Sequence, residues 1–200
     1  MAFYPTVLAT SNNTTVKTAL QTESVISKTP IGSMPSGLST ITCVEYSTGR
    51  DVVVYLTLNN FVVGALASAA AALAMGNIIY TLPAGAQYTT VAYKSISLTC
   101  PGTAVAVDLG IGSIIGVGAQ SVLSGVGATA EDYLTGVATT TGASGGTTVA
   151  QMVAVSAAIG TNVAASVKDI FLNAAATWNA NNTNSLLATG NISIKYSLMS

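Results

Sequence analysis

The sequence predicts an all-β fold, an antiparallel β-sandwich over residues 41–200 that is preceded by an extended N-terminal arm over residues 1–40. Three observations support this fold class. Several short segments are rich in β-branched residues, apolar and polar residues alternate within them, and turn-forming residues follow them. This combination is typical of short antiparallel strands that pack around one core.

Turn-forming residues bound three of the predicted strands. Residues 52–58 are rich in valine and end at the Asn pair 59–60. Residues 77–82 stop at 83–85, a Pro-Ala-Gly turn, and residues 95–100 alternate until a Pro-Gly pair closes them. Proline and glycine interrupt a strand because proline lacks an N–H group and glycine adopts turn conformations readily. We therefore expect three strands that end at these turns.

Period-two alternation marks two further strands, in which the apolar residues share one face. They are Val105, Val107 and Leu109 in the first segment, and Ile192, Ile194, Tyr196 and Leu198 in the second. In the second segment Asn, Ser and Lys occupy the alternate positions. One polar and one apolar face are what an antiparallel sheet over a single core requires.

Other segments are less regular. The alanines of residues 65–75 favour a helix, but the segment lies between two strand patterns, so a short helix and a crossover loop both fit. Residues 128–134 suggest one helical turn, and residues 142–146 a flexible loop tip. The longest apolar stretch, residues 61–75, is shorter than the about 20 residues that a membrane-spanning helix needs. We expect no membrane partner.

The N-terminal arm, residues 1–40, mixes Thr, Ser and Asn with a late cluster of Pro and Gly, and has no sustained apolar period. Such a segment fits an extended arm or a tail that is disordered in the free protein, and an arm that orders only on assembly satisfies both interpretations. The candidate assembly contacts in the arm are Phe3, Tyr4, Pro5, Ile31 and Met34.

The composition is nearly free of charge. Only 6% of the residues are charged and the net charge is −1, whereas about 25% is typical of soluble proteins. No basic field is available to neutralise phosphates, so we expect no nucleic-acid partner. A neutral surface of Thr, Ser, Asn and Gly suits a protein that partners cover, and the alternative is a secreted β-domain with such an exterior.

The sequence offers little chemistry. It contains no histidine, which excludes a Ser-His-Asp or Cys-His catalytic arrangement. Among the seven carboxylates no spacing nominates a glycosidase pair, and Glu131 and Asp132 are expected in a solvated turn or helix start. Residues 110–116 follow G-x-G-x-x-x-G, which is not a nucleotide fingerprint and indicates a flexible, close-packed turn. We expect a non-enzymatic protein with no cofactor and no metal.

The two cysteines, Cys43 and Cys100, lack metal-ligand spacing. Both fall within predicted strands, so a cross-strand disulfide and buried free thiols remain open, and synthesis in a cytosol favours the free thiols.

Four segments, taken in order, resemble the capsid decoration (cement) proteins of tailed bacteriophages, particularly those of aquatic bacteria. The resemblance lies in apolar strands that close in a turn, a small-residue loop before an acidic pair, and a final alternating strand. The segments are residues 77–86 (NIIYTLPAGA), 107–132 (from VDLGIG to the pair Glu131-Asp132), 167–174 (VKDIFLNA) and 186–194 (LLATGNISI).

This resemblance implies a jelly-roll-like sandwich that forms homotrimers on the outer capsid surface at local three-fold positions. It further implies a structural virion protein, made in the host cytoplasm, that stabilises the shell by bridging neighbouring major capsid proteins. The alternative is a receptor-binding or fibre-tip module of the virion, and a carboxylate-pair glycosidase is a third hypothesis.

Overall fold

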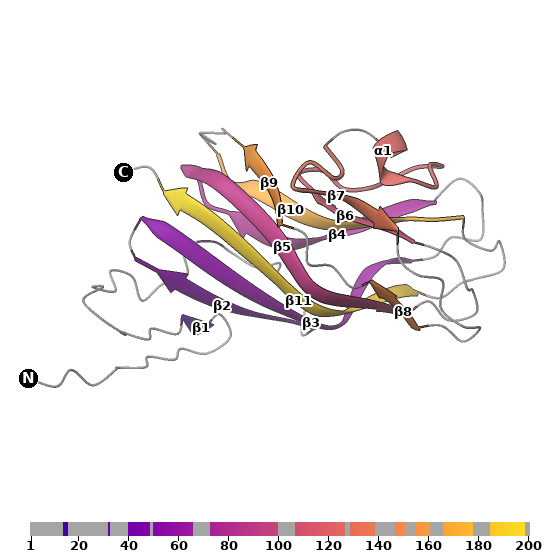
Figure 1. Cartoon of the computed structure of the whole chain (residues 1–200), viewed down its shortest axis with the longest axis horizontal. Coiled ribbons are helices and arrows are strands. Elements are labelled where there is room, and N and C mark those ends of the chain that lie inside the picture. Colours follow the sequence, from indigo (N-terminus) through magenta and orange to yellow (C-terminus); the bar gives the residue numbers. More distant parts are fainter. Residues whose placement is uncertain are drawn as a thin grey trace, which may run out of the picture.

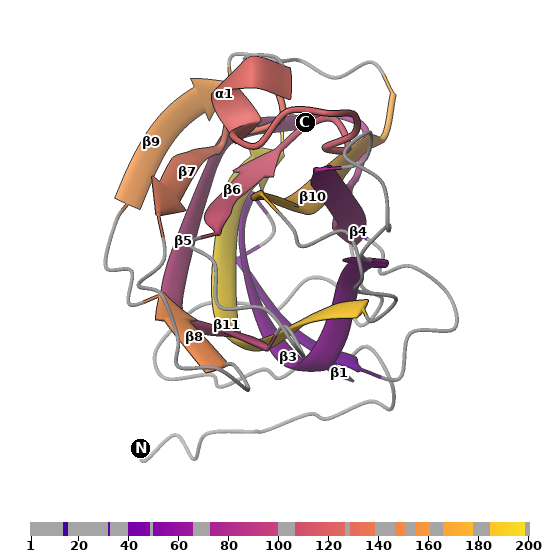
Figure 2. The same cartoon turned by 90° about the vertical axis from the view of Figure 1, so that its right-hand side faces the viewer.

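Two curved β-sheets pack face to face in the computed structural model (Figures 1 and 2). Each pairing of named strands in the described chain is antiparallel except that of the short first strand. The structure describes residues 14–15, 32, 40–48, 50–65, 73–99, 107–126, 129–138, 147–150, 155–160, 166–177 and 185–198.

The larger sheet has seven strands in the order β1-β2-β3-β11-β5-β8, and β9 also pairs with β5. Its strands are β1 (Thr14–Thr15), β2 (Ile41–Ser47), β3 (Asp51–Ala65), β5 (Ala86–Thr99), β8 (Thr147–Ala150), β9 (Val155–Gly160) and β11 (Ser185–Leu198). The smaller sheet has the order β4-β10-β6-β7. Its strands are β4 (Ala74–Leu82), β6 (Asp108–Gly112), β7 (Leu134–Ala138) and β10 (Lys168–Ala175), and one short helix, α1 (Leu123–Val126), lies outside both sheets.

The strand pairs are nested along the chain. β3 pairs with β11, β4 with β10, β5 with β8 and β9, and β6 with β7. A two-stranded ribbon that is rolled up so that its pairs alternate between two sheets is a jelly roll. The predicted antiparallel, jelly-roll-like sandwich is therefore confirmed.

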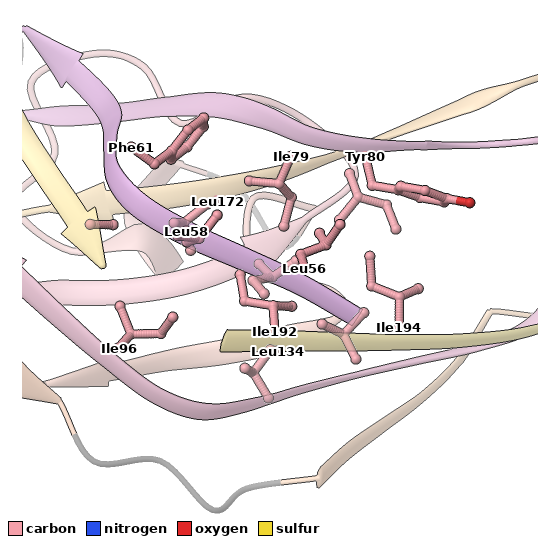
Figure 3. Packing of buried hydrophobic residues seen from close by; sticks show 14 of the residues in the cluster. Leu56, Leu58, Phe61, Ile79, Tyr80, Ile96, Leu134, Leu172, Ile192 and Ile194 are labelled. Atoms are coloured by element: carbon pink, nitrogen blue, oxygen red, sulfur yellow. The ribbon is translucent and has the colours of Figure 1, made fainter. Parts of the chain in front are cut away.

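Alternating side chains build the core between the sheets. In β3 every second residue from Val52 to Leu58 is buried, and in β11 Ile192, Ile194 and Tyr196 are buried, as the alternation predicts. Figure 3 shows how residues of both sheets meet, among them Leu56 and Ile192 from the larger sheet and Leu172 from the smaller. The hydrophobic effect of this burial holds the two layers together.

The prediction that a strand ends at Asn59 and Asn60 is wrong, because β3 continues to Ala65. The register of β3 with β11 shifts here, and Asn60 has a positive φ of 52°. Asparagine tolerates this left-handed conformation better than most residues. The Asn pair therefore forms a bulge that keeps the next residue, Phe61, in the core.

The turn at residues 83–85 is confirmed. The Ala86 N–H group donates to the Pro83 carbonyl oxygen at 3.3 Å, and Gly85 has a φ of 84°, as the third residue of a type II turn requires. The helical turn predicted at residues 128–134 is wrong, because α1 lies earlier in the chain, at Leu123–Val126, and β7 begins at Leu134.

Some predicted features lie outside the described residues. They include residues 66–72, Cys100, the loop tip at 142–146 and most of the N-terminal arm.

Replacing Phe61 with alanine tests how far the core depends on the bulge. Phe61 is fully buried, so Phe61→Ala should lower the free energy of unfolding by about 3–5 kcal/mol. The neighbouring Val62 is 39% exposed, and Val62→Ala should change it by no more than about 0.5 kcal/mol. Urea unfolding measures both, and equal losses would contradict this account of the bulge.

Candidate functional site

The connection between β6 and β7 covers the outer face of the smaller sheet. Its helix α1 lies on the side of that sheet that faces away from the larger sheet (Figures 1 and 2). Leu123 of α1 is fully buried in a small cluster with Ala74 of β4 and Ala175 of β10. Part of the connection therefore forms a third layer over the sandwich.

Asn173, on β10, binds this connection from below. Its neighbours Leu172 and Ala174 face the core between the sheets, so the Asn173 side chain lies on the opposite face of β10. It is fully buried there as well. The Gly116 N–H group donates to Asn173 Oδ1 at 2.8 Å, and Asn173 Nδ2 donates to the carbonyl oxygens of Ile114 at 2.9 Å and Ala130 at 2.7 Å. One amide thus satisfies three backbone groups on both arms of the connection.

Glycines on the neighbouring strands make room for this contact. In the sheet register Asn173 lies between Gly76 of β4 and Gly110 of β6. A Cβ atom on Gly76 would overlap Asn173 Oδ1, and a Cβ atom on Gly112 would overlap the Ala130 backbone. The prediction of a flexible turn at residues 110–116 is wrong for residues 110–112, because these belong to β6. The predicted close packing is confirmed, because the Ala130 backbone lies against Gly112.

Two aspartates fix other points of the connection. The N–H group and the hydroxyl of Ser113 each donate to the Asp132 carboxylate at 2.7 Å. The Leu123 N–H group donates to Asp108 Oδ2, also at 2.7 Å. Hydrogen bonds to a charged acceptor are stronger than neutral ones. Asp132 lies in a bend and is half-buried, so the turn expected there is present, but its carboxylate is a structural acceptor.

The backbone of the connection also joins β4. The N–H groups of Leu73 and Ala74 both donate to the Gly118 carbonyl oxygen, at 2.8 and 3.0 Å. Together with Asn173, Asp108 and Asp132, these bonds anchor the connection at several separate points, so its conformation is fixed by the sandwich.

Four aliphatic side chains project from this anchored connection. Ile114, Ile115, Val117 and Val122 are between 42% and 58% exposed, and we call them the apolar loop surface. The sequence has no charged residue from 113 to 130. Connecting loops usually present polar residues to water, and a group of exposed apolar side chains on a fixed backbone suits contact with another protein. The apolar loop surface is the candidate functional site.

Four aspartates accept hydrogen bonds from backbone or hydroxyl groups of the fold. Besides Asp108 and Asp132, Asp51 accepts a hydrogen bond from the Ser197 hydroxyl at 2.6 Å, and Asp169 accepts one from the Thr81 hydroxyl at 2.7 Å. In the described part of the chain no group of three or more potential metal ligands comes together.

A second polar cluster lies within the core. Glu45 of β2 is 3% exposed, and its Oε1 accepts a hydrogen bond from the Tyr80 hydroxyl at 2.5 Å. Tyr80 and Tyr196 hydroxyls are 3.2 Å apart, and because the Tyr80 proton goes to Glu45, Tyr196 is the donor to Tyr80. Figure 3 shows the Tyr80 hydroxyl pointing away from the surrounding aliphatic side chains. The cluster therefore places hydrogen-bonded polar atoms inside the core.

Burial changes the ionisation of this cluster. It raises the pKa of the Cys43 thiol to about 12. Cys43 lies on the same face of β2 as Glu45, and the charge of Glu45 raises this pKa further. Burial is also the main cause that raises the pKa of Tyr80 and of Tyr196 above the usual tyrosine value. Cys43 is a free, buried thiol, which confirms one of the two alternatives for that residue.

The arm residues predicted as assembly contacts, Phe3, Tyr4, Pro5, Ile31 and Met34, lie outside the described residues, so they remain predictions. Sequence reasoning missed Asn173 and the apolar loop surface. The available signal was the uncharged, glycine-spaced aliphatic run that begins at Ile114, but nothing in that run distinguishes exposed side chains from buried ones.

No described helix is long and apolar enough to cross a membrane.

The fold and the site define a structural class, a jelly-roll sandwich with a fixed apolar surface over the outer face of its smaller sheet. No family model, curated protein or solved structure matches this chain.

Replacing Asn173 tests its role as the anchor of the connection. Asn173→Ala leaves three backbone groups without their partner and should lower the free energy of unfolding by about 2–4 kcal/mol. Hydrogen exchange of the Gly116 amide should accelerate as well. The exposed Asn191 accepts a hydrogen bond from the Thr57 hydroxyl at 3.0 Å, and Asn191→Ala should cost less than about 1 kcal/mol. Unchanged exchange at Gly116 in Asn173→Ala would contradict the anchoring role.

The buried thiol and phenols predict a loss of stability at alkaline pH. Because folding raises the pKa of Cys43 from 9.0 to about 12, the unfolded chain releases this proton first as the pH rises. The protonated Cys43 thiol therefore contributes fully to the free energy of unfolding below pH 9. This contribution is lost as the pH rises from 9 to 12. In urea unfolding across this range, Cys43→Ala should show a shallower decline than the unsubstituted chain. Val52→Ala, a buried control without an ionisable group, should keep the full slope.

Proposed function

We propose that this chain is a structural virion protein of a tailed bacteriophage that binds the outer surface of the capsid. In this role copies of the chain associate, as trimers, and bridge neighbouring major capsid proteins so that the shell resists rupture. The protein acts by surface contact and carries out no reaction.

The observation that carries the proposal is the apolar loop surface. A neighbouring protein that covers Ile114, Ile115, Val117 and Val122 would remove apolar area from water, which stabilises the contact by about 25 cal/mol per Å². Because hydrogen bonds to Asn173 and Asp132 already order the loop, little conformational entropy is lost on binding.

The fold and the sequence agree with this role. Jelly rolls are frequent in viral capsid domains, although lectins share the architecture. Three of the four segments that resemble capsid decoration proteins lie on β4, β6 and β10, which are neighbours in the smaller sheet. These strands are the ones that hold the loop, so the resemblance and the candidate site coincide.

The low charge fits repeated, modest contacts. With 6% charged residues, the chain has few ion pairs to offer a partner, and binding would depend on apolar burial. Many copies on one closed shell would add such contacts through multivalency.

Co-sedimentation with emptied shells of the phage that carries the protein tests the proposal. Val117→Asp places a charge on the most exposed residue of the apolar loop surface and should weaken binding about ten-fold or more. Val167→Asp is the matched control, because Val167 is 65% exposed but lies outside the connection, just before β10. We expect this variant to bind within about two-fold of the unsubstituted chain.

Two results would count against the proposal. One is failure of the unsubstituted chain to sediment with shells, and the other is binding of Val117→Asp as tight as that of Val167→Asp. Alanine substitution of the arm residues Phe3, Tyr4, Ile31 and Met34 in the same assay tests their predicted contribution.

A further inference from the structure

Nine side chains of β2, β3 and β11 share the outer face of the larger sheet, where these strands lie side by side (Figure 1). None of the nine is buried, because the alternate residues of each strand face the core. The strand register arranges them in three rows across the strands, and we call them the tyrosine face. The rows are Tyr46, Val53 and Lys195; Val44, Tyr55 and Ser193; and Thr42, Thr57 and Asn191.

Two tyrosines form the aromatic centre of this face. Tyr46 is 37% exposed and Tyr55 is 50% exposed. Their ring centroids lie 5.7 Å apart and the ring planes meet at 86°, so the two rings pack edge to face. Aromatic pairs favour this arrangement, and each ring limits the rotation of the other. The pair is therefore an ordered, exposed aromatic corner.

Hydrogen-bonding groups and one positive charge surround the tyrosines. The Thr57 hydroxyl donates to Asn191 Oδ1 at 3.0 Å, which orients the amide. Lys195 is exposed and is the one charged residue among the nine. One row further along β3, Asp51 accepts a hydrogen bond from the Ser197 hydroxyl at 2.6 Å. The tyrosine face thus combines aromatic rings, hydroxyl and amide groups, and a cation.

The size of the tyrosine face suits a small ligand. Three neighbouring strands and three rows of alternate residues span about 10 Å by 14 Å, because strands lie about 4.8 Å apart and alternate residues about 6.8 Å apart. This footprint of about 140 Å² is far below the about 800 Å² that each partner buries in a standard protein interface. A short oligosaccharide covers such an area.

Sugar rings match the chemistry of this face. Their C–H groups form apolar surfaces that pack against aromatic rings, and their hydroxyl groups exchange hydrogen bonds with hydroxyls and amides. The single cation adds charge complementarity to a sugar that carries a carboxylate. Lectins are among the proteins that share the jelly-roll architecture.

We propose that the tyrosine face binds an acidic oligosaccharide. Tyr46 and Tyr55 pack against the C–H surfaces of its sugar rings, and Lys195 pairs with a sugar carboxylate. This inference does not rest on capsid binding, because the tyrosine face belongs to the larger sheet and the apolar loop surface lies over the smaller one.

An NMR titration of the full chain with tetragalacturonate tests the proposal, and cellotetraose is the uncharged comparison. Amide signals of the tyrosine face should shift, with a dissociation constant of about 1 mM. Cellotetraose should bind at least about five-fold more weakly, and added salt should weaken only the binding of tetragalacturonate.

Substitutions assign the binding to the tyrosine face. Tyr55→Ala should weaken the binding of tetragalacturonate about ten-fold and Lys195→Ala about five-fold. Tyr55→Phe keeps the ring and should bind within about three-fold of the unsubstituted chain. Lys168→Ala is the matched control for charge, because Lys168 lies on β10 of the smaller sheet, and it should bind within about two-fold.

Three results would overturn the proposal. They are the absence of shifts up to about 10 mM tetragalacturonate, unweakened binding by Tyr55→Ala, and equal binding of the two oligosaccharides. If neither oligosaccharide binds and Tyr55→Ala no longer sediments with shells, the tyrosine face contacts protein instead. If Val117→Asp loses shell binding but keeps tetragalacturonate binding, the two surfaces act independently, as proposed.

Discussion

The pairing of β3 with β11 is the constraint on which the rest of the structure depends. It joins the first long strand of the sandwich to the last, along nearly the whole of both strands. The nested pairs β4–β10 and β6–β7 continue this ribbon, and rolling the ribbon up places them in the second layer. Such long-range pairing must overcome a large loop-closure entropy, and the apolar faces of both strands supply the compensating burial.

Scarcity of charge shapes how the polar groups are used. In the part of the chain that the structure describes, Asp51, Asp108 and Asp132 act as hydrogen-bond acceptors for backbone and hydroxyl groups. Buried polar groups are tolerated only when they are satisfied. Asn173 meets this requirement without any net charge, because its amide both donates and accepts. The connection over the smaller sheet is thereby ordered by neutral or singly charged contacts.

The apolar loop surface and the edge of β2 differ in what surrounds them. The aliphatic side chains of the apolar loop surface are exposed, and the backbone that carries them is hydrogen-bonded to Asn173. At the edge of β2, Thr14 and Thr15 pair with Val44 and Glu45, and the Gly32 N–H group donates to the buried Glu45 carboxylate.

The sequence by itself determined the fold class, because period-two alternation is a local property that each strand displays alone, as Ile192 and Ile194 do. It also located the turn at residues 83–85, where proline and glycine act on the backbone directly. Only the tertiary structure decided that the Asn pair at 59–60 is a bulge, that Asn173 faces the loop, and that Glu45 meets Gly32. These outcomes depend on partners far away in the chain, and no local pattern specifies which distant group a strand will meet.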